Sequence, residues 1–256
     1  MLSDLTAGAL ADAAARRELV SFAEVETAAL AQSPALNALE FLAPADRIKV
    51  IAEVKRASPS RGDLAAIADP AALARTYAAN GASTISVLTE GRKFKGTLED
   101  LRAVRAEVSV PVLRKDFIAE KYQILEARAA GADLVLLIVA ALEQDLLAEL
   151  NEFALSLGLT VLVETHSREE LHRALDIDAK LIGVNARNLS TFELDRELFA
   201  SLVGEIPAGV IKVAESAVRN ATDVQHYRDA GADVVLVGEA LVTSDPAATL
   251  QSFLAV

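Results

Sequence analysis

The chain contains no cysteine and no tryptophan, and aromatic side chains make up only 4% of its 256 residues. Without cysteine, disulfides, zinc–thiolate sites, iron–sulfur clusters and cysteine nucleophiles are excluded. No apolar run approaches the ~20 residues that a membrane-spanning helix needs, and no signal-peptide pattern opens the chain. We therefore expect a cytoplasmic protein that does not associate with membranes.

Positive charge is also scarce, because 25 basic residues face 37 acidic ones and leave a net charge of -12. Without a global basic field the chain does not attract phosphate backbones, so no nucleic-acid partner is expected. The basic residues are unevenly placed, however. They are either solvated loop residues or a positive wall for a small anionic substrate. Those near the ends of the first three apolar runs are Lys55, Arg56, Arg61, Arg92, Lys93, Lys95, Arg114, Lys115 and Lys121.

Hydrophobic residues make up 52% of the chain and gather in eight short runs, with helical periodicity between them. The runs are 47–55, 84–90, 111–116, 133–139, 160–164, 181–185, 210–216 and 233–239. Strand and helix alternating eight times within about 250 residues predict an α/β protein with a (β/α)8 TIM barrel. Such barrels keep their active sites at the C-terminal ends of the strands, where most of these runs end on polar residues.

The helix ends carry a repeat that supports this fold. Gly81, Gly131 and Gly231 each precede a predicted strand, and Asp178 occupies the same place without a glycine. A left-handed residue there ends the helix before the chain enters the next strand.

Residues 1–46 precede the first predicted strand and form an N-terminal helical extension. Two helices are predicted over 3–17 and 21–32, with Ser3 and Ser21 as their N-caps. We expect the extension to pack on the barrel and to help cover its mouth. Because no linker-like stretch separates it, residues 1–256 are expected to form a single domain.

Strand side chains alternate between two faces, which predicts the direction in which polar groups point. Ile51, Glu53 and Lys55 share one face of the first strand, and the alternate residues, all aliphatic, share the other. The aliphatic set belongs against the helices, so Glu53 and Lys55 point into the top of the barrel. By the same alternation four further polar side chains point into the top of the barrel, namely Lys115, Glu164, Asn185 and Glu215.

So many unlike charges in a dry barrel require either mutual pairing or a chemical purpose. One interpretation is a purely structural charge network that fills the barrel top. The other is a set of acid and base groups whose pKa values shift one another. We favour the second, because filling space rarely needs lysines and glutamates from several strands.

The last two strands carry a phosphate signature. The seventh runs into Glu215, Ser216 and Ala217, and the eighth into Gly238 and Glu239. Loops after strands seven and eight form the usual phosphate site of this barrel class. Ser58, in a Pro/Gly turn after the first strand, either closes over the same phosphate or is an ordinary turn residue.

The three histidines have no metal-ligand spacing, so no metal site is predicted. His166 lies two residues past Glu164 at the rim of the mouth, whereas His172 and His226 fall inside predicted helices and are expected on the surface.

Several segments resemble the indole-3-glycerol phosphate synthase family, and the similarity extends over essentially the whole chain. EVKRASPS and LRKDFI are the most specific of its motifs. The segments are 51–60, 87–90, 94–96, 112–118, 183–189 and 213–216.

The resemblance implies a (β/α)8 enzyme of tryptophan biosynthesis that needs no cofactor. It would convert 1-(2-carboxyphenylamino)-1-deoxyribulose 5-phosphate into indole-3-glycerol phosphate, carbon dioxide and water. The substrate is thus a small phosphorylated anion. The family usually has glycine after the Glu-Ser of the seventh strand, where this chain has Ala217.

The resemblance also implies roles for single residues. Lys115 would be the general acid that protonates the ketone oxygen. Lys55 would bind the substrate carboxylate and is a candidate second acid. Glu164 would stabilise or deprotonate the ring-closed intermediate and help dehydration, while Glu53 would orient the lysines and the ribulose hydroxyls.

The remaining residues would position the substrate. Asn185, Glu215 and Ser216 would hold the sugar chain with support from Arg187, and Phe94 is also expected among the substrate-binding residues. The phosphate would meet Ser58, the backbone around Ser216 and Ala217, and Gly238 with Glu239.

Two other functions fit parts of the pattern. Lys115 or Lys55 could form a Schiff base in an aldolase-like barrel. Alternatively, the chain could be a non-catalytic phosphate-sugar binder, because a fold alone does not imply a function. The oligomeric state expected is a monomer, with a homodimer as the alternative.

Overall fold

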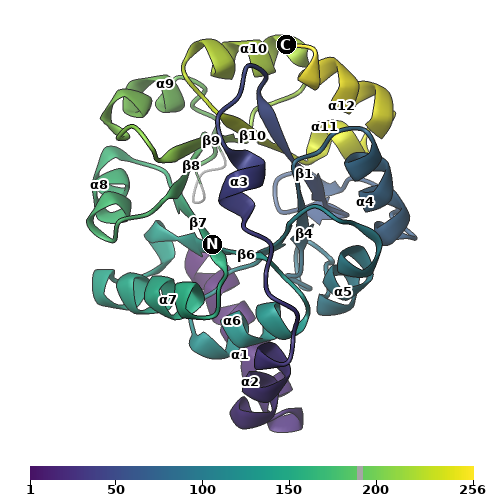
Figure 1. The fold of residues 1–256 in the computed structure, drawn as a ribbon, viewed down its shortest axis with the longest axis vertical. Helices are drawn as coiled ribbons and strands as arrows, with labels where there is room; N and C mark the ends of the chain where they lie inside the picture. The colour runs from purple at the N-terminus through teal and green to yellow at the C-terminus, as the bar shows by residue number, and fades with distance from the viewer. Residues whose placement is uncertain (189–192) are drawn as a thin grey trace.

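The computed structural model describes residues 1–188 and 193–256, so Leu189 of the family-like segments lies outside the described residues. Eight parallel strands form a closed barrel (Figure 1), as predicted. Each coincides with a predicted run to within two residues at either end. The strands are β1 (Lys49–Val54), β4 (Thr84–Leu88), β5 (Val112–Lys115), β6 (Leu134–Ile138), β7 (Thr160–Thr165), β8 (Leu181–Asn185), β9 (Ile211–Glu215) and β10 (Val234–Val237).

The ring closes between the two ends of the chain. β1 pairs on one side with β4 and on the other with β10, with Lys49 opposite Val234. A small antiparallel hairpin, β2 (Ala57–Ser58) and β3 (Gly62–Asp63), follows β1 at the mouth.

The helices surround the ring of strands in Figure 1. The left-handed residues that end them include Gly81, Gly131, Gly231 and Asp178, as predicted. None of the helices formed by the described residues is long and apolar enough to cross a membrane. The helices that follow β1 in the chain are α4 (Pro70–Ala79), α5 (Leu98–Glu107), α6 (Lys121–Ala129), α7 (Gln144–Ser156), α8 (Arg168–Asp176), α9 (Leu198–Leu202), α10 (Ala221–Asp229), α11 (Glu239–Val242) and α12 (Pro246–Leu254), with 3-10 turns η1 (Val139–Ala141) and η2 (Val203–Glu205).

Two apolar layers confirm the predicted alternation of side chains. Val50, Ala52 and Val54 lie in the layer between strands and helices. Ile51 and Leu113 lie in a separate cluster inside the barrel. The strand residues next to Ile51 and Leu113 on the same face are therefore directed inward, toward the mouth.

The N-terminal extension forms α1 (Leu2–Leu19), α2 (Phe22–Leu30) and a third helix that was not predicted, α3 (Ala38–Leu42). Ser21 caps α2 and forms a capping box with Glu24. The Ser3 cap was wrong: α1 begins at Leu2, because Leu2 itself packs on the interior cluster and draws the helix start toward it.

The extension reaches both ends of the barrel. Leu5 of α1 belongs to the interior cluster together with Phe117, which follows β5 at the mouth. Ala38 and Leu42 of α3 are fully buried in the same cluster, and α3 lies across the centre of the ring in Figure 1. One segment thus contributes apolar cover at the mouth and at the opposite end.

Candidate functional site

A cavity of about 790 Å³ opens at the C-terminal ends of the strands. The structure brings every residue predicted for the site to this one cavity. Its lining includes Glu53, Lys55, Ser58, Phe94, Lys115, Glu164, Asn185, Arg187, Glu215, Ser216, Ala217, Gly238 and Glu239.

Lys115, at the end of β5, is the centre of the ionic contacts. Its Nζ lies 2.6 Å from Oε2 of Glu164 and 3.3 Å from Oε2 of Glu215, and both carboxylates are at most 2% exposed. The Asn185 amide donates to Oε1 of Glu164 at 3.1 Å, and the Ser216 hydroxyl donates to Asn185 Oδ1 at 2.8 Å. The ends of β5, β7, β8 and β9 are thereby joined in one hydrogen-bonded chain.

The three charged groups of this chain shift one another's pKa values. Burial lowers the pKa of Lys115, but the surrounding glutamates outweigh burial and raise it. Burial also opposes ionisation of Glu164, yet Lys115 and His166 hold the pKa of Glu164 well below its usual range. For Glu215, burial and the neighbouring Glu164 outweigh Lys115 and raise the pKa to about 8. Near neutral pH the site therefore holds an ammonium, a carboxylate and a largely protonated carboxyl group.

Two glycines make room for the charges. A Cβ at Gly238 would stand 2.5 Å from Glu53 Oε1 and 3.0 Å from Lys55 Nζ. Lys55 Nζ itself lies 2.7 Å from Glu53 Oε1. A Cβ at Gly183 would stand 2.1 Å from Glu215 Oε1. Any side chain at either position would therefore displace an acid or base group.

The side of the cavity predicted to hold phosphate has unusual backbone geometry. Ser216 and Ala217 are consecutive left-handed residues, with φ of 69° and 57°. The buried hydroxyl of Ser58 has no hydrogen-bond partner among the described residues. α11 after Gly238 is only four residues long, and Arg61 pairs with the Glu239 carboxylate. The negative charge of Glu239 is thereby balanced.

The sequence profile described as indole-3-glycerol phosphate synthase matches residues 2–253. The chain belongs to the indole-3-glycerol phosphate synthase family. An indole-3-glycerol phosphate synthase from Leifsonia xyli subsp. xyli is 68% identical over 253 residues, covering 99% of this chain and 97% of the relative. One from Beutenbergia cavernae is 58% identical over 243 residues, covering 95% of this chain and 90% of the relative.

Solved structures share the barrel at much lower identity. A thiamine phosphate pyrophosphorylase from Pyrococcus furiosus has a TM-score of 0.61 at 15% identity, covering 80% of this chain and 93% of its own. An N-acetylmannosamine-6-phosphate 2-epimerase from Clostridium perfringens has a TM-score of 0.61 at 13% identity, covering 83% and 94%. At this identity the likeness shows the fold alone.

The cavity of this indole-3-glycerol phosphate synthase family member has an apolar wall that sequence reasoning missed in part. The rings of Phe94 and Phe117 lie 6.1 Å apart between centroids, and Leu5 of α1 also lines the cavity. Phe117 belongs to the LRKDFI motif and lies two residues after Lys115, so its place at the mouth could have been predicted from the sequence. The extension was expected to help cover the mouth, but nothing in the sequence singled out Leu5 of α1 as the residue that does so. Arg219 also lines the cavity and was not predicted as a site residue.

The positive wall holds for only part of the predicted set: Lys55, Arg61 and Lys115 line the cavity. The interpretation was wrong for most of the others, because acidic partners distant in sequence bind them away from it. These pairs are Arg56–Asp100, Arg92–Asp12, Lys95–Asp63 and Lys121–Glu149.

Arg114 faces the opposite side of β5 from Lys115 and forms a second buried ionic cluster. Its guanidinium lies 2.9 Å from Asp116 Oδ2 and donates to Thr89 Oγ1 at 3.1 Å. It also approaches Glu126 of α6, which Arg16 of α1 binds at 2.8 Å. The cluster attaches the extension to the strand that carries Lys115.

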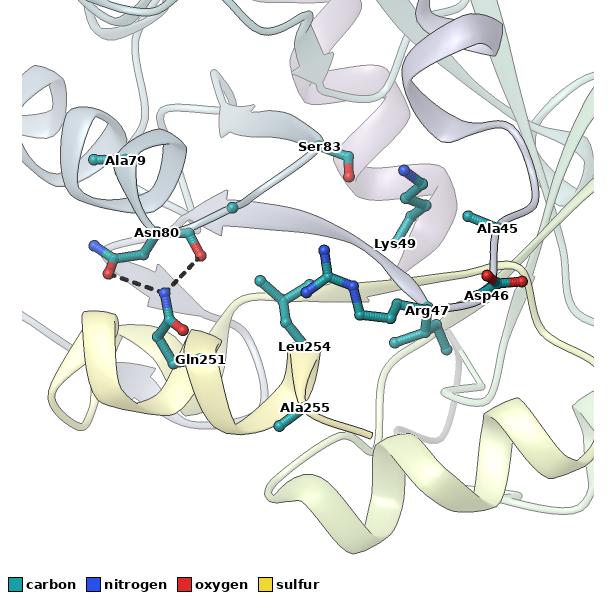
Figure 2. A pocket seen from close by; sticks show the side chains of 12 residues that line it. Ala45, Asp46, Arg47, Lys49, Ala79, Asn80, Ser83, Gln251, Leu254 and Ala255 are labelled. Carbon is teal, nitrogen blue, oxygen red and sulfur yellow. Dashed lines mark hydrogen bonds between the residues drawn. The ribbon is translucent and has the colours of Figure 1, made fainter.

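A second hollow of about 600 Å³ lies at the N-terminal end of the barrel (Figure 2). Arg47, Lys49 and Ser83 line it together with the C-terminal ends of α4 and α12. Helix C-termini carry partial negative charge that favours cations, which accounts for Arg47 and Lys49 there. The acid and base groups lie at the other end, so the mouth is the candidate active site of this family member.

Proposed function

We propose that Lys115 and Glu164 carry out the acid–base chemistry of the indole-3-glycerol phosphate synthase reaction in this chain. Family membership and the 68% identical relative make the chain a lyase of tryptophan biosynthesis that acts on a phosphorylated substrate. The observation that carries the residue assignment is the position of Lys115 Nζ between two buried carboxylates in the cavity at the mouth.

Ring closure explains the need for one acid and one anion. A carbon of the substrate's aromatic ring attacks the ribulose ketone, a C–C bond forms, and the carbonyl oxygen takes a proton from the Lys115 ammonium. Positive charge develops on the substrate nitrogen, and the ionised Glu164 stabilises it. The raised pKa of Lys115 ensures that it carries its proton when the substrate arrives.

The later steps restore the aromatic system. Carbon dioxide leaves from the ring carbon, and its bonding electrons stay with the ring. The hydroxyl then leaves with a proton as water, and a proton is lost from the neighbouring carbon, which completes the indole. Glu215, protonated near neutral pH and 3.3 Å from Lys115 Nζ, can return a proton to that lysine for the dehydration. Lys55 is a second candidate for the same step.

The lining of the cavity suggests how the substrate lies. Lys55, oriented by Glu53, binds the substrate carboxylate. Ser58 and the backbone at Ser216, Ala217, Gly238 and Glu239 take the phosphate at the other side. The aromatic ring rests on the wall of Phe94, Phe117 and Leu5. Asn185 and Ser216 hold the sugar chain, with Arg187 in support.

The test uses the absence of tryptophan, since the chain contributes no indole fluorescence of its own. We would mix the protein with the carboxyphenylamino-deoxyribulose phosphate and follow the rise of indole fluorescence. Lys115→Ala should lower kcat by about 10²–10⁴-fold. Lys121→Ala is the matched control, because Lys121 is partly exposed, pairs with Glu149 and lies outside the cavity lining.

Each unexpected result has its own meaning. A wild-type rate in Lys115→Ala would remove Lys115 from the chemistry, and no signal from folded wild-type protein would remove the reaction. A covalent adduct trapped by borohydride would favour the Schiff-base alternative. The expected monomer, the cytoplasmic location and the lack of nucleic-acid partners stay predictions of the sequence.

A further inference from the structure

His166 lies directly behind Glu164, outside the residues that line the cavity. It follows β7 and precedes α8, and its side chain is 10% exposed. Its Nε2 lies 3.2 Å from Oε1 of Glu164, and its Nδ1 lies 3.0 Å from Oε2 of Glu170. Each ring nitrogen therefore faces a carboxylate oxygen.

This arrangement suits an imidazolium better than a neutral ring. A neutral imidazole has one N–H, so one of its nitrogens would present a lone pair to a carboxylate oxygen. Glu164 comes from β7 and Glu170 from α8, and behind Glu164 stand Lys115 and Glu215. Burial alone would lower the pKa of His166, but the contacts with Glu164 and Glu170 outweigh burial and raise it to about 9.

Glu164 consequently has donors on both of its oxygens. Lys115 occupies Oε2, and Asn185 and His166 approach Oε1. The Nε2 contact is at ion-pair distance but is not a well-aligned hydrogen bond, since Nε2 has no hydrogen-bond partner within the described part of the chain. Its influence on Glu164 is therefore mainly that of a nearby positive charge.

We propose that the imidazolium of His166 is a positioning residue, which acts through Glu164 by keeping this carboxylate ionised and directed toward Lys115 and the substrate. The inference rests on the role proposed above for Glu164. It assigns His166 no contact with the substrate. Loss of the positive charge should therefore slow turnover without weakening substrate binding.

The kinetic test compares His166→Gln with His172→Gln, a control on the exposed face of α8 where His172 contacts Glu205. His166→Gln should lower kcat about tenfold, as expected when the nearby positive charge that favours the ionised Glu164 is lost, with KM changed less than about twofold. His172→Gln should keep the wild-type values. An unchanged kcat in folded His166→Gln, or a loss seen entirely in KM, would overturn the inference.

A double-mutant cycle tests whether His166 acts through Glu164. In a Glu164→Gln background the further change His166→Gln should alter kcat less than about twofold, because the group it serves is gone. Multiplying effects would contradict the inference. If Glu164→Gln alone keeps wild-type activity, the proposed role of Glu164 fails first, so the two failures can be told apart.

A spectroscopic measurement needs no folded variant of His166. The chain has three histidines, so ¹⁵N-histidine NMR spectra can be assigned with His172→Gln and His226→Gln. In wild-type protein both nitrogens of His166 should stay protonated until the pH approaches about 9, and Glu170→Gln should lower that midpoint. A neutral His166 ring at pH 7 would overturn the inference whatever the kinetics show.

Discussion

β5 carries two buried ionic clusters on neighbouring residues, and the clusters differ in how many of their polar side-chain atoms have a hydrogen-bond partner. On the outward face, every side-chain nitrogen and oxygen of Arg114, Asp116 and Glu126 has a partner. On the inward face, Oε1 of Glu215 has no hydrogen-bond partner in the described structure, and burial raises the pKa of Glu215 to about 8. A buried cluster that only supports a fold saturates its polar atoms, whereas this reactive cluster leaves an atom unpaired beside the cavity.

The largest effect on stability should come from breaking the outward cluster. Arg114→Met leaves two buried carboxylates without their shared cation, and we expect a loss of about 3–5 kcal/mol in the free energy of unfolding. Urea unfolding measures this. Lys115→Met is the matched change one residue away and should cost less, because Glu215 is already largely protonated near neutral pH and the ionised Glu164 keeps its contacts with Asn185 and His166. Equal urea midpoints for the two variants would contradict the expected difference in stability between the outward and the inward cluster.

Glu215→Gln should change stability in a pH-dependent way. Because the pKa of Glu215 is raised on folding, proton binding stabilises the folded state fully below the unfolded pKa near 4.5, and this stabilisation is lost as pH rises through about 8. Gln stays neutral throughout. The stability of the variant relative to wild type should therefore increase between pH 5 and pH 9, by roughly 4 kcal/mol at most. A constant difference in melting experiments would place Glu215 in an ordinary ionised state.

Ala217→Gly tests the phosphate side of the mouth. Ala217 has a left-handed conformation, with φ of 57°, which costs about 1–2 kcal/mol for alanine, and glycine would relieve that strain. The greater freedom of glycine in the unfolded chain opposes the gain by about 0.4–1 kcal/mol. We expect a net increase of up to about 1 kcal/mol and tighter inhibition by inorganic phosphate. Lower stability would mean that the alanine methyl is held by favourable contacts.

The smallest effect is expected from Arg92→Ala. Arg92 and its partner Asp12 are 52% and 38% exposed, and an exposed ion pair contributes about 0–1 kcal/mol. Thermal unfolding should change little and KM not at all. A clearly raised KM would mean that basic residues outside the cavity lining also attract the anionic substrate.

The barrel and most of its site could be predicted because their signals are local. Strand side chains alternate with a period of two, so Glu53 and Lys55 follow from the aliphatic residues between them. The same parity separates Lys115 from its neighbours, although the chain alone did not reveal what Arg114 binds on the other face.

What escaped prediction depends on partners distant in sequence. α3 has five residues, too few to show a helical period, and it is stabilised by burial of Ala38 and Leu42. Asp100, Asp12 and Glu149 neutralise lysines and arginines that stood near strand ends. The contact between His166 and Glu170 was the exception, since a spacing of four residues at a helix start could have indicated it.

The pairing of β1 with β10 has a consequence for synthesis of the chain. Glu53 and Lys55 leave the ribosome long before Gly238, and it is the missing side chain of Gly238 that leaves room for their charged groups. Until β10 is made, β1 and β9 keep unpaired edges of the kind that favour aggregation. An incomplete nascent chain therefore has neither a closed ring nor a substrate site, and catalytic competence arrives only with the final strand.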